Sequence, residues 1–252
     1  MRHGTPHISS LKRTLSMLET VIADGGRNGL SALARQVGMP IATAHRQVTT
    51  LVAEGYLKPS GGGRHVAGSR LLGLLHRLDE KQVIANIASP VLHRLAGQVR
   101  SVVQLGTFEN DMVTYRIKTG RGASDLFTRV GLQLEAYCSG MGKVLLAHLP
   151  EVEREAYLSG RPFVALTDRT IVDPNHLRQE LAVVAEQGFA IDDEEIASGL
   201  RCMAVPLHNS EGGVVAAISV SQALSSRVRW NDTELLKSLK EAAFSIENDA
   251  LS

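Results

Sequence analysis

The chain has 252 residues, enough for two domains of ordinary size, and 44% of them are hydrophobic, as in a soluble globular protein. Its two cysteines lack CxxC or CxxxH spacing, which argues against a zinc site or a disulfide framework, and without an 18-residue apolar run or signal-peptide core we expect a cytoplasmic protein. Residues 1–78 carry ten basic and three acidic residues (net +7) and residues 79–252 carry seventeen and twenty-three (net −6), so the first part is predicted to bind a polyanion, with nucleic acid the leading candidate.

Helical spacing of apolar residues predicts three helices in the basic part. The first carries apolar residues from Leu11 to Ile22 and ends at the glycines 25–26. The second starts with Ser31 as its N-cap, and after the break at residues 38–40 the third covers residues 42–54. Two short helices around a tight turn, after a longer first helix, are typical of a helix-turn-helix.

A hairpin is predicted directly after the third helix. Residues 55–59 and 64–67 are short extended runs around a glycine-rich turn at residues 60–63. A hairpin in this position is the wing of a winged helix. The alternative, a generic three-helix bundle with a surface hairpin, does not explain why arginines gather here.

In a winged helix the third helix enters the major groove of DNA. Arginine can pair with guanine and glutamine with adenine, while threonine and histidine can hold phosphates. Lys12, Arg13 and His65 would mostly contact the DNA phosphate backbone. A partly buried structural role is an equal alternative for His45. The residues predicted to contact DNA are Arg35, Thr43, His45, Arg46, Gln47, Thr50 and Arg64.

The acidic part begins with two predicted strands, residues 101–105 and 112–117, joined by the hairpin signal at residues 109–111. Further on, the small residues 139–142 open a predicted helix at residues 143–148, and backbone N–H groups at such a helix start attract anions. Neither GxxxxGK[ST] nor GxSxG fits this segment. We therefore interpret Ser139 as an N-cap or a ligand contact rather than a nucleophile.

These segments resemble IclR-type transcriptional regulators over residues 9–250. The resemblance implies an α+β fold, with an N-terminal winged helix-turn-helix at residues 1–68, a linker helix at 69–80, and a C-terminal GAF-like α/β effector-binding domain at 81–252. The strings that carry it are residues 33–40, 43–46, 51–57, 68–74, 139–147, 188–195, 199–206 and 216–221.

The resemblance also implies an effector pocket. Its residues would be Ser139, Gly140, Met141, Asp192, Cys202, Ser219 and Ser221. Ser219 and Ser221 are two apart on a strand, so both hydroxyls face one side and suit a carboxylate or hydroxyl-bearing small molecule. Leu126, Leu134 and Met203 are weaker candidates for apolar walls.

Two of these positions have alternatives. In the acidic run 192–195, Asp192 is expected to point inward and the other three to be mixed; the alternative is that the whole run is only a solvated turn. Cys202 is either a pocket residue or a small buried core residue.

The function expected is a ligand-responsive, DNA-binding regulator of catabolic genes, more often a repressor. Its expected partners are an operator in double-stranded DNA, a carboxylate-bearing small organic or aromatic acid, and a second copy, as a homodimer or a dimer of dimers. No cofactor, metal site, catalytic residue or membrane contact is expected. The alternatives are an activator of the same family, an enzyme with Cys202 or Ser139 as nucleophile, and a ligand-independent architectural DNA-binding protein.

Overall fold

The computed structural model describes residues 7–225 and 231–250. The chain forms two compact units, Met1–Asp79 and Glu80–Ser252. The division between them falls inside the segment that the sequence predicts as a linker. The finer division into residues 1–68, 69–80 and 81–252 remains a proposal.

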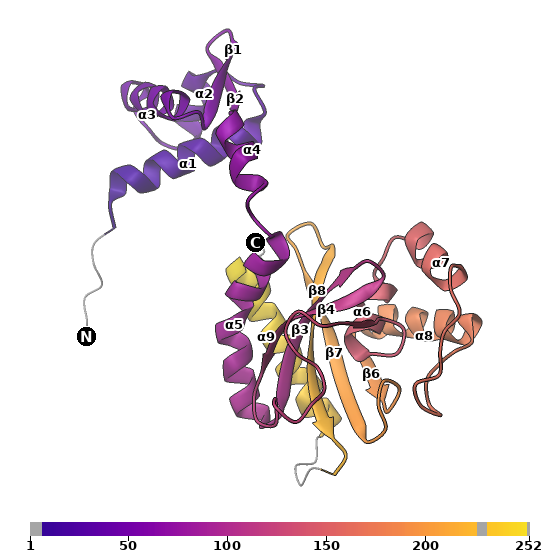
Figure 1. The fold of residues 1–252 in the computed structure, drawn as a ribbon. Coiled ribbons are helices and arrows are strands. Elements are labelled where there is room, and N and C mark those ends of the chain that lie inside the picture. The colour runs from indigo at the N-terminus through magenta and orange to yellow at the C-terminus, as the bar shows by residue number, and fades with distance from the viewer. Residues whose placement is uncertain (1–6, 226–230, 251–252) are drawn as a thin grey trace, which may run out of the picture. The chain divides into compact units, whose positions relative to one another are not determined.

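The first unit is a winged helix-turn-helix, as expected (Figure 1). Its elements are α1 (Ser9–Asp24), α2 (Leu30–Gln36), α3 (Ile41–Ala53), β1 (Leu57–Gly61), β2 (Arg64–Ala67) and α4 (Ser69–Leu75). Met17 and Val21 of α1, Leu33 of α2 and Val48 of α3 form its core with Leu57 of the wing. One local prediction is wrong: α2 begins at Leu30 after Gly29, so Ser31 lies within the first turn and does not cap the helix.

The end of α1 is set by Gly25, as predicted. Gly25 has φ 63°, in the left-handed region that a glycine adopts without a Cβ penalty. Its N–H donates to the carbonyl oxygens of Val21 and Ile22, which the end of the helix leaves without intrahelical partners.

The second unit is a six-stranded antiparallel sheet between two layers of helices (Figure 1). The strand order is β5-β4-β3-β8-β7-β6. Helices α5 and α9 cover one face, and α6 lies on the other with α8 against it. Its elements are α5 (Glu80–Val99), β3 (Val102–Glu109), β4 (Met112–Thr119), β5 (Gln133–Glu135), α6 (Gly140–Ala147), α7 (Glu151–Ser159), α8 (Pro174–Gln187), β6 (Ala190–Asp193), β7 (Leu200–His208), β8 (Val214–Ala223) and α9 (Asp232–Ala250).

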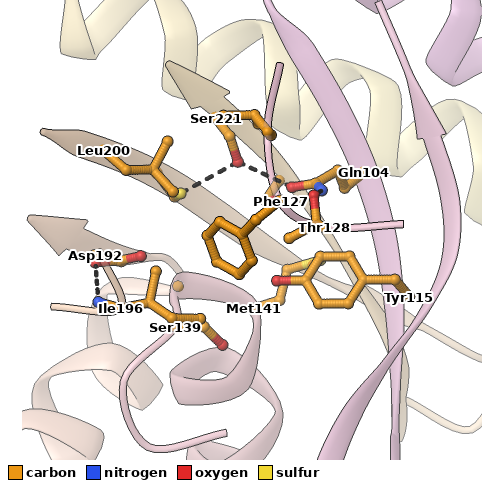
Figure 2. A pocket seen from close by; sticks show the side chains of 14 residues that line it. Gln104, Tyr115, Phe127, Thr128, Ser139, Met141, Asp192, Ile196, Leu200 and Ser221 are labelled. Carbon is orange, nitrogen blue, oxygen red and sulfur yellow. Dashed lines mark hydrogen bonds between the residues drawn. The ribbon is translucent and has the colours of Figure 1, made fainter. Parts of the chain in front are cut away.

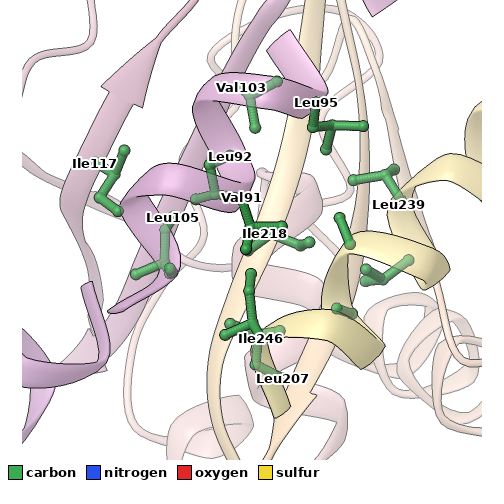
Figure 3. Packing of buried hydrophobic residues seen from close by; sticks show 14 of the residues in the cluster. Val91, Leu92, Leu95, Val103, Leu105, Ile117, Leu207, Ile218, Leu239 and Ile246 are labelled. Atoms are coloured by element: carbon green, nitrogen blue, oxygen red, sulfur yellow. The ribbon is translucent and has the colours of Figure 1, made fainter. Parts of the chain in front are cut away.

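The face under α5 and α9 is the larger apolar core. Figure 3 shows Leu105 and Ile218 of the sheet against Leu92 of α5 and Leu239 and Ile246 of α9. Because side chains alternate along a strand, the neighbours of these residues point to the opposite face, beneath α6. That face holds the polar residues of the candidate pocket.

The β3–β4 hairpin contains a bulge that changes which side chains face α6. Leu105 pairs with Ile117 but Gly106 pairs with Tyr115, so Arg116 is an extra residue in β4. Ile117 packs in the core under α5, whereas Tyr115, two positions away on the same strand, packs in the cluster under α6. The bulge thereby directs Tyr115 toward the candidate pocket.

Candidate functional sites

The first unit presents a polar face along α3. His45, Arg46 and Thr50 are exposed on it, and Thr43 and Gln47 are half-buried. The opposite face of α3 is buried through Ala44, Val48 and Leu51. Such a helix, packed on one side and polar on the other, is what insertion into a DNA groove requires.

The other predicted DNA contacts lie outside α3. Arg35 is exposed on α2, and Arg64 is exposed at the start of β2, where its Nε lies 3.4 Å from the carbonyl oxygen of Gly61 in the wing turn. The Gln47 side chain has its Oε1 buried without a hydrogen-bond partner.

A pocket in the second unit lies on the sheet face beneath α6. Its floor is a row of polar side chains on adjacent strands: Gln104 of β3 pairs with Ser219 of β8, Ser221 of β8 with Cys202 of β7, and Cys202 with Asp192 of β6. All five line the pocket, and Figure 2 labels Gln104, Asp192 and Ser221 among them. Strand register alone therefore brings together residues up to 117 positions apart in the sequence.

Hydrogen bonds link one end of this row to the loop that follows β4. The Oγ of Ser221 lies 3.1 Å from the Sγ of Cys202 and donates to Gln104 Oε1 at 3.0 Å. Gln104 Nε2 donates to the hydroxyl of Thr128 at 2.6 Å (Figure 2). Lys118 holds the same loop by donating to the carbonyl oxygens of Leu126 and Thr128. The loop is thus fastened over the floor of the pocket.

The start of α6 forms the opposite wall. Ser139 is its N-cap, one of the two roles predicted for it, and accepts a hydrogen bond from the N–H of Gly142 at 3.1 Å. The helix begins at Gly140, three residues earlier than predicted. Within the described residues, the N–H groups of Gly140 and Met141 have no hydrogen-bond partner, which leaves them available to an anion.

Gly142 is required for this arrangement by close packing. A Cβ there would lie 2.0 Å from the carbonyl oxygen of Ala136. Only glycine lets the first turn of α6 approach the preceding loop so closely. The spacing of small residues in this segment therefore has a structural cause.

Asp192 is buried, and only one of its two carboxyl oxygens has hydrogen-bond partners. Its Oδ1 accepts hydrogen bonds from the N–H groups of Glu195, at 2.8 Å, and Ile196, at 3.4 Å, while its Oδ2 is buried without a partner. Burial, together with the nearby Glu195 carboxyl, raises the pKa of Asp192 to about 7, although the two N–H groups oppose the shift. The pocket therefore contains a carboxyl group that titrates near neutral pH.

Behind Asp192, the ammonium group of Lys143 holds the acidic turn against α6. Its Nζ donates to Glu195 Oε1 at 2.6 Å, to Glu180 Oε1 at 2.9 Å and to the carbonyl oxygen of Ile191 at 2.6 Å. Burial alone would lower the pKa of Lys143, but the two carboxylates outweigh it and raise that pKa. Burial raises the pKa of Glu195 despite this contact, and its Oε2 has no partner.

The pocket is nearly closed in this structure. Its volume of about 10 Å³ has room for about one water molecule. The Phe127 ring lies among the polar side chains in its middle (Figure 2), and the described lining residues include no lysine, arginine or histidine. A ligand larger than water therefore requires the Leu126–Thr128 segment to move.

All seven predicted effector residues line this one pocket. Asp192 points inward and Glu195 is buried, whereas Asp193 is exposed and Glu194 half-buried, so the expectation for the acidic run is confirmed. Of the three weaker candidates only Leu126 lines the pocket. Leu134 lies in the cluster beneath α6, and Met203 faces the α5 core because it alternates with Cys202.

The sequence interpretation missed six residues that line the pocket. They are Gln104, Tyr115, Phe127, Thr128, Ile196 and Leu200. A polar residue inside the apolar run of β3 was the available signal for Gln104. Nothing in the sequence marks the other five.

Two family models together match most of the chain. The "IclR helix-turn-helix domain" matches residues 10–61, and "Bacterial transcriptional regulator IclR C-terminal" matches residues 76–248. The HTH-type transcriptional regulator XynR of Escherichia coli (strain K12) is 32% identical over 232 residues, 91% of each chain. The transcriptional repressor IclR of the same organism is 29% identical over 246 residues, 94% of this chain and 90% of the relative.

Solved structures match both units. One is an IclR homolog from Microbacterium hydrocarbonoxydans complexed with 4-hydroxybenzoate, which is 31% identical with a TM-score of 0.62 and is aligned over 96% of this chain and 99% of its own. The Thermotoga maritima IclR is 26% identical with a TM-score of 0.63, over 98% and 100%. In the part of the chain that the structure describes, no helix has the length and apolarity needed to span a bilayer.

Proposed function

This chain belongs to the IclR family of bacterial transcriptional regulators, and from that premise we propose that a small organic acid binding beneath α6 controls its grip on an operator. The chain is a DNA-binding regulator rather than an enzyme: the relatives named above are regulators. The observation that carries the proposal is the meeting of the seven predicted effector residues, from four separate segments, around one pocket.

The pocket favours an acid that also carries a hydroxyl group. The N–H groups of Gly140 and Met141 at the start of α6 suit a carboxylate, and the Oδ2 of Asp192, when ionised, needs a hydrogen-bond donor. The homolog's ligand, 4-hydroxybenzoate, has both groups. A hydroxy acid would satisfy the two ends of this pocket at once.

Binding would be coupled to a change of conformation because the pocket has no space for such a ligand. The Phe127 segment would leave the pocket, and the Gln104–Thr128 hydrogen bond would break. A ligand shifts an equilibrium only by the difference in its affinity for the two states. Here the two states would be the loop inside the pocket and the loop displaced from it, and the ligand would bind only the second. Repression is the favoured sign, since relatives include named repressors.

We expect the functional form to be at least a homodimer. The N-cap residue of α1, Ile8, and the helix residues Leu11, Leu15 and Ile22 are 66%, 55%, 49% and 41% exposed, at spacings that place them on one helix face. Exposed leucines also crowd α4 and the residues after it, with Leu72 59% and Leu75 65% exposed. A basic domain that leaves so much apolar surface on two of its helices is suited to a protein interface.

Leu15→Glu is expected to shift the protein toward smaller species and to weaken operator binding at least tenfold, because two half-sites would no longer be bound together. Light scattering after size exclusion measures the first effect and a gel shift the second. Val183→Glu, an exposed apolar position on α8, is the control and should change neither. An unchanged mass for Leu15→Glu would exclude α1 from the interface.

Arg46→Ala is expected to reduce operator affinity about 5- to 150-fold, because losing one bidentate base contact costs about 1–3 kcal/mol. The measurement is a gel shift with the operator and with a scrambled duplex, because the loss should be confined to the operator. Arg94→Ala, exposed on α5, is the control. Equal affinity of Arg46→Ala and the wild type for the operator would remove α3 from the recognition surface.

The central experiment is a gel shift on the DNA upstream of the chain's own gene, challenged with hydroxylated and unhydroxylated organic acids. At least one acid should change the bound fraction in the wild type but not in Ser219→Ala. A response to every acid that survives Ser219→Ala would place the effector elsewhere. Operator binding indifferent to every acid would favour the ligand-independent architectural protein.

A further inference from the structure

Beside the effector pocket lies a second hollow, which opens on the same loop. Its volume is about 440 Å³, and it shares Leu126 and Ser221 with the effector pocket. Ser221, labelled among the residues of the effector pocket in Figure 2, therefore lines both hollows. A ligand that displaces the Leu126–Thr128 segment would come into contact with both compartments.

The two compartments differ in charge. The inner pocket contains Asp192, with Glu195 close behind it, and no lysine, arginine or histidine is among its described lining residues. The Lys143 ammonium group lies behind the pocket and is already bound by two carboxylates. The outer hollow is lined by Arg100 and Arg121, and neither guanidinium group forms an ion pair within the residues described. One carboxylate, Asp125, lines it as well and accepts a hydrogen bond from the hydroxyl of Ser124. The outer hollow thus has the excess of positive charge that the inner pocket lacks.

The backbone of Arg100 has a conformation that is uncommon for a residue with a side chain. It follows the last residue of α5 with φ 53°, in the left-handed region where a helix commonly ends with glycine. A side chain with a Cβ costs about 1 kcal/mol at such a position. The fold accepts this cost and thereby fixes the base of the arginine side chain at the rim of the hollow.

We propose that this hollow is the outer compartment of the effector site and that Arg100 and Arg121 bind a second anionic group of the effector. This inference rests on the proposed function and narrows it: the effector class is an acid with two anionic ends, one at the start of α6 and the other at the two guanidinium groups. Paired arginines recognise a carboxylate or a phosphate through charge-assisted hydrogen bonds. The Leu126–Thr128 segment lies between the ends and would have to move to admit the linking carbons.

The test uses acids of increasing length, because two separated anion sites impose an optimal spacing. Straight-chain dicarboxylates from succinate to suberate, and the monocarboxylates of equal carbon number, are titrated by calorimetry into the full-length protein. The affinity of the diacids should peak at one chain length, at least tenfold above the matching monoacid. That peak should fall as the salt concentration rises.

Variants test whether Arg100 and Arg121 cause the peak in diacid affinity. R100Q/R121Q should remove the advantage of the diacid and leave the monoacid affinity unchanged, whereas R100K/R121K should retain most of it. R129Q, at an exposed arginine on the same loop that does not line the hollow, is the matched control and should keep the peak. If the double variant unfolds, R121Q alone decides the matter, because that side chain lies in an exposed loop.

Every outcome bears on the proposal. A flat series, a peak that survives R100Q/R121Q, a peak lost equally in R129Q, or no binding of either series would overturn it. These results are separate from the proposed function, which is measured by operator binding. Monoacids that release the operator without any advantage of diacids would leave the regulator intact and remove the outer compartment.

Discussion

Replacing Lys143 by methionine is expected to lower the free energy of unfolding by about 3–5 kcal/mol. The ammonium group is 1% exposed and is the cation between Glu195 and Glu180. Methionine fills much of the same volume but leaves Glu195 buried without its counterion, and the cost of an uncompensated buried charge dominates. Urea unfolding followed by circular dichroism measures the loss.

Two further variants separate charge from packing. Lys237→Met removes an exposed lysine, 3.9 Å from Glu241, and should change stability by less than about 0.5 kcal/mol. Lys143→Met combined with Glu195→Gln should recover part of the loss, because the uncompensated charge is gone. If Lys143→Met costs no more than Lys237→Met, the buried cluster contributes nothing to stability.

Asp192→Asn is expected to stabilise the protein more at pH 8 than at pH 5, by about 2–3 kcal/mol relative to the wild type. The pKa of Asp192 is about 7 in the folded protein, against 3.8 for an ordinary Asp. From about pH 4 to 7 the unfolded chain has lost this proton while the folded chain keeps it, so wild-type stability falls as the pH rises. Asparagine does not titrate, so the stability of the variant does not fall with pH for this reason.

The same substitution should impair ligand binding. Above pH 7, where Asp192 is ionised, the contrast is greatest: the introduced amide must turn its oxygen toward the N–H groups of Glu195 and Ile196, so its nitrogen would present a donor where the carboxylate presents an acceptor. Affinity for a hydroxy acid should fall at least tenfold as stability rises. Asp193→Asn, on the exposed side of the same strand, is the control. If the free energy of unfolding depended on pH in the same way in both variants, the burial of Asp192 would not be the cause of that dependence.

Much of the fold could be predicted because its signals are local. The helix end at Gly25 and the hairpin at Asn110 and Asp111 follow from the conformations those residues tolerate, and both of the latter have positive φ. The common orientation of Ser219 and Ser221 follows from the alternation of side chains on a strand. For these positions a short window of sequence contains the whole cause.

The rest of the site depends on features that no local window contains. Gln104 joins the pocket through the register of β3 with β8, and Tyr115 faces it because a bulge at Arg116 breaks the alternation of β4. Phe127 belongs to a loop whose position is set by tertiary hydrogen bonds. The burial of Lys143 could not be predicted from its neighbours in the sequence, because the two carboxylates that pair with it lie 37 and 52 residues away.

The burial of both cysteines has a consequence for oxidative chemistry. Burial raises the pKa of Cys138 to about 12 and, with the nearby Asp192, raises that of Cys202 well above its ordinary value. Peroxides and thiol reagents attack the thiolate, so both sulfur atoms stay protonated and unreactive in the closed protein. The regulator should therefore keep its response through an oxidative burst that would inactivate a protein with exposed thiols. Cys202 should become accessible to alkylation only while the Leu126–Thr128 segment is displaced from the pocket. Its alkylation rate should therefore measure how often the pocket opens.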